Sequence, residues 1–270
     1  WFAVGTGLAI GIASAGQALG QGGVPFASSF LIESFGISGA FAITGAIMLG
    51  VLIPLSLLLR PPPKPSEKSA AAAASAEKTY LPFKTVVPTL SLATLLCCTC
   101  MSVPLMHLVP LIQDRGFEPA EASSVIFVML MVAIVGRVAF GKLADIIGAL
   151  PAYMTATAWM AILIYGFTQM GTLSNFYLYA VIYGFGYAGV MTGVLVSVAA
   201  LTHPSRRAAA MGIVSTFGWF GHANGGYMGG YLFDLTGDYS IAYAIAAASG
   251  LINLIVVGTL YMKVRGPSLR

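Results

Sequence analysis

The chain has 270 residues, of which 58% are hydrophobic and only 8% are charged, and its formal net charge is +4. A soluble domain carries about a quarter charged residues because its surface faces water. This composition therefore excludes an ordinary soluble protein and predicts a surface that mostly contacts a lipid bilayer. The net positive charge indicates no nucleic-acid partner, because the basic residues gather in the segments between apolar runs.

Apolar runs long enough to cross a membrane recur along the whole chain. A helix needs about 20 mostly apolar residues to span the hydrocarbon core. Eight segments meet this requirement: 5–28, 36–59, 84–113, 119–144, 150–171, 174–201, 206–232 and 239–263. The sequence therefore predicts an all-α membrane protein with about eight transmembrane helices.

Basic residues occupy alternate loops. One set of loops carries Arg60, Lys64, Lys68, Lys78, Lys84, Lys142, Arg206, Arg207, Lys263, Arg265 and Arg270, whereas the opposite set has only Arg115 among several acids. Loops rich in Lys and Arg stay in the cytoplasm. We therefore expect the 61–83 linker and the C-terminus to be cytoplasmic, in a bacterial inner membrane.

The one long connection, 61–83, combines prolines with an Ala/Ser/Glu/Lys tract, a composition typical of a solvated linker. Two predicted helices precede it and six follow. Many secondary transporters consist of two six-helix bundles joined by a cytoplasmic loop. We therefore interpret 1–60 as the last two helices of an N-terminal bundle and 84–270 as a complete C-terminal bundle. The start at Trp1 supports the expectation that four helices precede this chain.

Ionisable side chains inside membrane spans are costly and are candidate functional residues. Arg137 is the clearest case, because a guanidinium facing the bundle interior binds a carboxylate through two hydrogen bonds. Its alternatives are snorkelling to the interface or pairing with Asp145. His222 titrates near neutral pH and suits substrate binding or proton coupling, unless it is a packed histidine bonded to Asn224 or the backbone.

Further polar candidates lie in the third and sixth predicted helices. His107, beside Pro104 and Pro110, suits gating or proton entry, or a structural place at the interface. Tyr183 and Tyr187 are one turn apart, so one of them is expected to face a cavity, with aromatic packing as the alternative. The three cysteines lack the spacing of a metal site, and we expect no metal and no cofactor; they are Cys97, Cys98 and Cys100.

The loop after the fourth predicted helix carries Gly141, Asp145 and Gly148 in a G-x-x-x-D-x-x-G pattern. Glycines permit a tight turn, and an aspartate accepts hydrogen bonds from a helix N-terminus or pairs with a base. The alternative is an ordinary helix-end cap. Together with two helices before the linker and six after it, this pattern resembles the conformational loop motif of the major facilitator superfamily.

Two segments are similar to a narrower branch, the monocarboxylate transporters and the related oxalate/formate antiporters. Small residues recur every four or five positions over 7–20, and 107–116 reads H-L-V-P-L-I-Q-D-R-G. The resemblance implies substrate binding by Arg137, by the His222 region and by a tyrosine of the sixth predicted helix. The chain departs from the branch at Ala133, where many animal members carry an aspartate. It also has no lysine between Arg207 and Lys263, which disfavours a dianion exchanger.

These observations predict a secondary active carrier for small organic anions that works by alternating access with a coupled proton or a counter-anion. The resemblance to the monocarboxylate branch implies that these anions are monocarboxylates. A buried cation without a nearby acid favours an anionic substrate. Alternatives are a multidrug or sugar carrier and a non-transporting, sensor-like member. We expect no enzyme activity, because the chain lacks H-E-x-x-H, G-x-S-x-G and Walker motifs.

Overall fold

The computed structural model describes residues 5–58 and 80–265, and helices form all its regular structure. The α-helices are α1 (Thr6–Leu58), α3 (Phe83–Gln113), α4 (Pro119–Ile147), α5 (Ala149–Leu163), α6 (Leu173–Leu201), α7 (Arg207–Thr236) and α8 (Ser240–Arg265), and the short 3₁₀ helices are η1 (Ile164–Gln169) and η2 (Pro204–Arg206). The predicted all-α class is confirmed. Most of the 61–83 linker lies outside the described residues.

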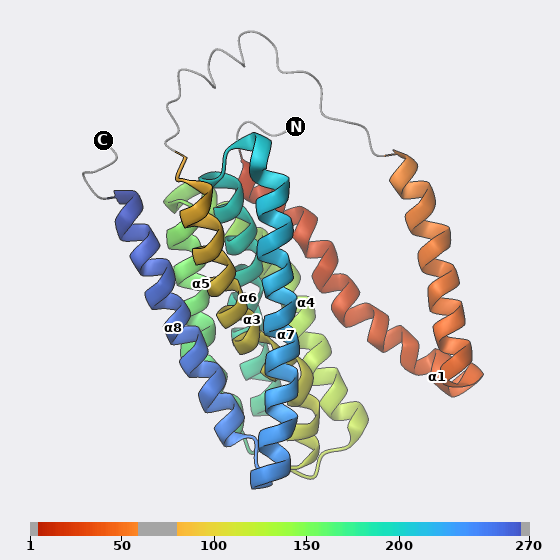
Figure 1. The fold of residues 1–270 in the computed structure, drawn as a ribbon. Helices are drawn as coiled ribbons and strands as arrows, with labels where there is room; N and C mark the ends of the chain where they lie inside the picture. The colour runs from red at the N-terminus through yellow and green to blue at the C-terminus, as the bar shows by residue number, and fades with distance from the viewer. Residues whose placement is uncertain (1–4, 59–79, 266–270) are drawn as a thin grey trace.

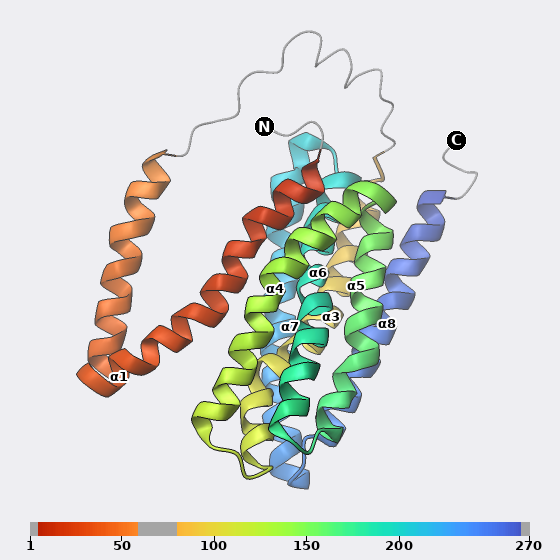
Figure 2. The ribbon, with the colours of Figure 1, turned by 180° about the vertical axis from the view of Figure 1, so that it is seen from behind.

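Helices α3 to α8 lie side by side in one bundle, and the first half of α1 packs along α4 (Figure 1). The second half of α1 bends away at Gly36, whose φ of 69° is non-helical. The sequence predicted two helices separated by a loop over 33–39, but the interruption is confined to this one residue. The second arm stands apart from the bundle in both views (Figures 1 and 2), and its large apolar residues, such as Phe41 and Leu57, are exposed.

Six segments are long and apolar enough to cross a membrane by length and composition: Phe30–Leu58, Phe83–Gln113, Pro119–Ile147, Ala149–Gln169, Leu173–Leu201 and Ser240–Arg265. The first half of α1 and all of α7 are helical as predicted but are not among them. Both contain many glycines together with Gln, Ser, Asn or His, which lower their hydropathy. Of these two segments, α7 supplies the candidate residues His222 and Asn224.

The predicted 150–171 helix divides into α5 and η1. At the junction, the Tyr179 hydroxyl of α6 donates a 2.6 Å hydrogen bond to the Leu163 carbonyl. The Tyr179 hydroxyl also lies where a side chain at Gly166 would be. This inter-helix contact accompanies the change from α-helical to 3₁₀ geometry, which the local sequence does not indicate.

The two ends of the bundle differ in charge. In Figure 1, α3 begins at the same end of the bundle at which α4, α6 and α8 end. Lys84, Lys142, Arg206, Arg207 and Lys263 belong to this end, whereas Asp114, Glu118, Glu121, Asp234 and Asp238 belong to the other. The alternation predicted from the loops is thus a separation of charge between the two ends.

Candidate functional site

The N-terminus of α1 is bound by a carboxylate of α4. Asp145 accepts hydrogen bonds from the backbone N–H groups of Gly7, at 2.8 Å, and Leu8, at 2.9 Å. The first N–H groups of a helix have no partner within the helix, and the helix dipole favours an anion there. Asp145 therefore joins the last turn of α4 to the first turn of α1, rather than pairing with Arg137.

Glycines bring these two helices into backbone contact. A side chain at Gly7 would collide with the Gly141 carbonyl, one at Gly11 with the Arg137 carbonyl, and one at Gly141 with the Gly7 carbonyl. Small residues of this kind let membrane helices approach closely. The small residues noted over 7–20 therefore form a direct helix–helix contact. This contact places α1 against the turn of α4 that carries Arg137.

Arg137 is buried at this contact, with only 1% of its surface exposed. Its Nη1 donates a 3.2 Å hydrogen bond to Oε1 of Gln17 on α1, and its Nε has no partner. Among the residues that the structure describes, no ion pair is formed by Arg137, and position 133, one turn earlier, is alanine. An unneutralised buried charge is expensive. The burial also means that the side chain does not snorkel to the interface.

Two tyrosines of α6 extend the polar site. Tyr187 interacts electrostatically with Arg137, and its ring centroid lies 5.9 Å from that of Tyr183. Both are fully buried, and within the described residues neither hydroxyl has a hydrogen-bond partner. Buried hydroxyls are nearly always bonded. Tyr183 also packs edge-on against Phe167, at 5.0 Å.

Sequence reasoning missed Gln17 and the neighbouring hydroxyl pair. The Ser14 hydroxyl lies 3.2 Å from that of Thr192 on α6, in a buried contact one turn from Gln17. The available signal was the spacing of Gln17 and Gln21, two amides four residues apart in a segment of small and apolar residues. That spacing places both on one face of a helix.

The histidine of α7 is separate from this group. His222 packs 5.9 Å from the Trp219 ring, and its buried Nδ1 has no partner among the described residues. Asn224 instead donates from Nδ2 to the Thr99 hydroxyl of α3 at 3.3 Å. Within the described residues, no recorded contact links either side chain to Arg137, so the predicted substrate-binding set divides into two groups.

His107 connects α3 to α7. Its Nε2 lies 2.8 Å from the Gly226 carbonyl oxygen, and its ring packs 5.4 Å from Tyr239. A carbonyl only accepts hydrogen bonds, so Nε2 carries the proton. The ring occupies the space next to Gly229, where a side chain would collide with it. Through the described contacts, His107 therefore joins α3 to α7 near the C-terminal end of α3.

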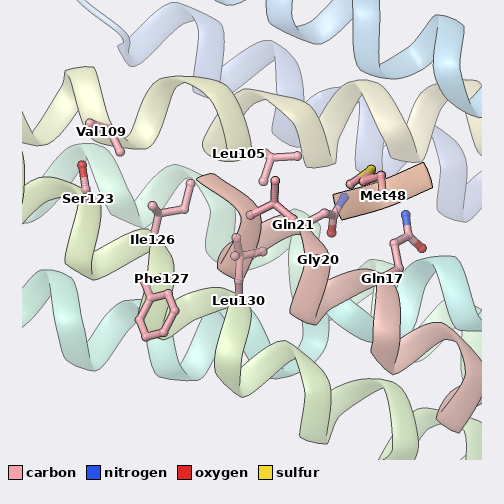
Figure 3. Close-up of a pocket in the computed structure, with 12 residues that line it drawn as sticks. Gln17, Gly20, Gln21, Met48, Leu105, Val109, Ser123, Ile126, Phe127 and Leu130 are labelled. Atoms are coloured by element: carbon pink, nitrogen blue, oxygen red, sulfur yellow. The ribbon is translucent and has the colours of Figure 1, made fainter. Parts of the chain in front are cut away.

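A cavity of about 810 Å³ lies between α1, α3 and α4 (Figure 3). Its wall is mostly apolar and contains no charged residue, and it includes Met48, Leu105, Val109, Ile126, Phe127 and Leu130. Polar groups enter from Gln17, Gln21 and Ser123. Gln17 is therefore shared by the cavity and by the Arg137 site.

The site therefore combines a glycine-mediated contact between α1 and α4 with a cation buried at that contact. Sequence comparisons identify the family to which the chain belongs. The family model of the Major Facilitator Superfamily matches residues 1–148 and 90–270. The chain belongs to this superfamily of transporters and is an integral, multi-pass membrane protein.

Its curated relatives lie in the monocarboxylate branch. Monocarboxylate transporter 13 of Rattus norvegicus is 30% identical over 252 residues, covering 89% of this chain and 56% of the relative. Monocarboxylate transporter 13 of Bos taurus is 27% identical over 250 residues, covering 89% and 57%. The chain therefore spans a little over half the length of these relatives, and the predicted resemblance to the branch is confirmed.

Proposed function

We propose that the protein containing this chain is a secondary carrier of small organic anions, most simply monocarboxylates, and that Arg137 binds the substrate carboxylate. The observation that carries the proposal is a buried guanidinium that has a neutral amide, Gln17, as its hydrogen-bond partner and no carboxylate within the described residues. An anion entering the site would supply the missing negative charge.

The neighbouring groups suit the same chemistry. A carboxylate accepts two parallel hydrogen bonds from a guanidinium, a geometry that lysine does not provide. The unpartnered Tyr187 hydroxyl near Arg137 is able to donate a third hydrogen bond to the bound anion. The names of the mammalian relatives, which describe monocarboxylate transporters, agree with this substrate class.

Alternating access would use the contact between α1 and α4. In our proposal, 1–60 belongs to an N-terminal bundle and 84–270 to a C-terminal bundle, joined through the 61–83 linker. The Asp145 hydrogen bonds to Gly7 and Leu8 close the basic end of the molecule. Opening that end would break these bonds while Arg137 releases its anion. Gly141 and Gly148 flank the bonding aspartate in the same loop motif.

The proposed orientation places the basic end, with the linker and the C-terminus, in the cytoplasm. The curated relatives are mammalian and give no support to the sequence-based assignment to a bacterial inner membrane. For coupling, we propose a proton at His222, whose Nδ1 is unpartnered, or exchange for a counter-anion.

The test is uptake of labelled lactate and pyruvate by the full-length protein in proteoliposomes. Arg137→Ala should lower the initial rate at least 100-fold, and Arg137→Lys should keep the charge but lower the rate about tenfold. Lys142→Ala, an exposed cation on the same helix, is the matched control and should leave uptake unchanged. Normal uptake by a folded Arg137→Ala variant would remove Arg137 from the substrate site.

A further inference from the structure

The cavity between α1, α3 and α4 meets the Arg137 site at a single side chain. Gln17 lines the cavity, and its Oε1 accepts the hydrogen bond from Arg137 Nη1. A carboxamide has one acceptor oxygen and an NH₂ group with two donors. With its oxygen bound to the guanidinium, Gln17 keeps its NH₂ donors for a ligand at the boundary between the cavity and the cation.

The cavity is too large and too apolar to serve a one- to three-carbon acid alone. Its volume of about 810 Å³ falls within the roughly 300–1,000 Å³ range of pockets that enclose drug-sized ligands. Leu105, Val109, Ile126 and Leu130 offer apolar surface from two helices. Such a wall stabilises a hydrocarbon group in proportion to the area removed from water.

We propose that this cavity holds the apolar body of the transported anion while Arg137 binds its carboxylate. The preferred substrates are then monocarboxylates with a branched or aromatic apolar part, rather than acids of one to three carbons. This inference rests on the proposed function, because it assigns a substrate class to the same Arg137 site.

Gln17 has a defined role in this arrangement. Its carbonyl oxygen accepts from one donor of Arg137, as a neutral substitute for a carboxylate oxygen. The entering carboxylate replaces it, and the released amide donates through Nε2 to the bound anion. Gln21, one turn further along the same face, has a buried Oε1 without a hydrogen-bond partner in the described part of the chain, and this oxygen is able to accept from a hydroxyl or amino group of the substrate.

The experiment compares KM values for acetate, butanoate, 4-methylpentanoate and 3-phenylpropanoate with the full-length protein in proteoliposomes. Each buried CH₂ group is worth about 0.8 kcal/mol, which corresponds to about a fourfold lower KM. We expect KM to fall along the series by at least tenfold. Equal KM values for all four acids, with uptake still dependent on Arg137, would overturn the substrate class and leave the proposed function intact. No uptake of any of the four acids would overturn both.

Variants of the cavity wall test its location. Ile126→Trp fills the cavity and should raise KM for 3-phenylpropanoate at least tenfold, a larger factor than for acetate. Val135→Trp, on the same helix at a position 62% exposed, is the control and should change neither. If Ile126→Trp does not fold, Ile126→Ala decides, because removing wall contacts should raise KM for 3-phenylpropanoate about threefold or more. An identical response of both acids to the folded Ile126 variant would overturn the assignment.

The role of Gln17 has its own test. Gln17→Glu replaces the neutral substitute with a tethered carboxylate that pairs with Arg137, so it should lower uptake of all four acids at least tenfold. Gln17→Met, of similar length and without charge, should retain more uptake than Gln17→Glu for each acid. Uptake that is unchanged by Gln17→Glu would overturn the displacement of Gln17 by the substrate.

Discussion

Two helix pairs in this molecule use glycine for close contact, yet they are joined in different ways. Along α3 and α7, side chains at Gly221 and Gly225 would collide with the Leu95 and Thr99 carbonyls, and one at Gly229 with the His107 ring. Between α1 and α4, glycine meets backbone only in the first turns of α1, at Gly7 and Gly11, whereas Gly22 meets side chains of α4. Both pairs also carry hydrogen bonds. Those between α3 and α7 come from His107 and Asn224, and those between α1 and α4 come from the charged side chains Asp145 and Arg137.

This comparison indicates which of the two helix–helix contacts is suited to opening. The α3–α7 pair lies within one bundle and is interdigitated over several turns, so separating it would create voids along its length. The α1–α4 pair also packs over several turns, but its recorded hydrogen bonds are those of Asp145 at one end and that of the buried Arg137. Bonds of this kind are exchangeable for bonds to water or substrate, as the proposed alternating access requires.

The largest effect is expected from overpacking the α3–α7 contact. Gly225→Leu would force a side chain onto Ser102 and the Thr99 backbone and should destabilise the protein by about 3 kcal/mol, equivalent to a fall in Tm of roughly 6–12 °C. Thermal unfolding in detergent measures it. Gly212→Leu, on the same helix with no atom within 4 Å of the added carbon, is the control. Equal Tm values for the two variants would contradict the close contact.

A smaller effect is expected from weakening the α1–α4 contact. Asp145→Asn removes the negative charge but keeps one acceptor for the Gly7 and Leu8 N–H groups, at a cost of about 1–2 kcal/mol. Each 1.4 kcal/mol is tenfold in an equilibrium. Thiol labelling of a cysteine introduced by Leu8→Cys should therefore become about tenfold faster.

The matched control for this labelling is Lys142→Gln, an exposed charge removed from the same helix end. It should leave the labelling rate and Tm unchanged. A rate unaffected by Asp145→Asn would show that the carboxylate does not hold the two helices together at this end.

The smallest effect is expected at His107. His107→Phe keeps a ring beside Gly229 but loses the hydrogen bond to the Gly226 carbonyl, which is worth about 0.6–1 kcal/mol between membrane helices. Tm should fall by roughly 2–4 °C. His107→Gln retains a donor and should recover part of the loss. If His107→Phe abolishes uptake with Tm unchanged, His107 has the gating or proton-coupling role that the sequence suggested.

Much of the fold was predictable because the formation of a membrane-spanning helix depends mainly on the residues of that segment. Length and hydropathy of a segment decide whether it crosses a bilayer, and the ends of α3, α4, α6 and α8 lie within a few residues of the predictions. The predictions differ where another helix intervenes. The end of α5 coincides with the Tyr179 hydrogen bond to Leu163, and the predicted loop after the first helix is reduced to the bend at Gly36.

The site was less predictable, because its members come from distant positions. Arg137 was identifiable as an uncommon charge in an apolar helix. Its association with Gln17, 120 residues earlier, depends on the backbone contact of α1 with α4. His222 carries the same kind of sequence signal as Arg137, yet the structure records no contact between them, because α7 packs chiefly on α3.

The sequence was sufficient to show that this protein is an α-helical membrane protein, which of its ends is basic, and that the arginine of one apolar helix has alanine, not an acid, one turn earlier. These properties follow from the composition, from the charges in the loops and from the spacing of residues along single helices. Only the tertiary structure decided that Asp145 binds the start of α1, that Gln17 is the partner of Arg137, and that an apolar cavity adjoins both. These contacts depend on atoms that helix packing brings together from distant positions. The hydropathy of a membrane helix, in contrast, is the sum over its own residues.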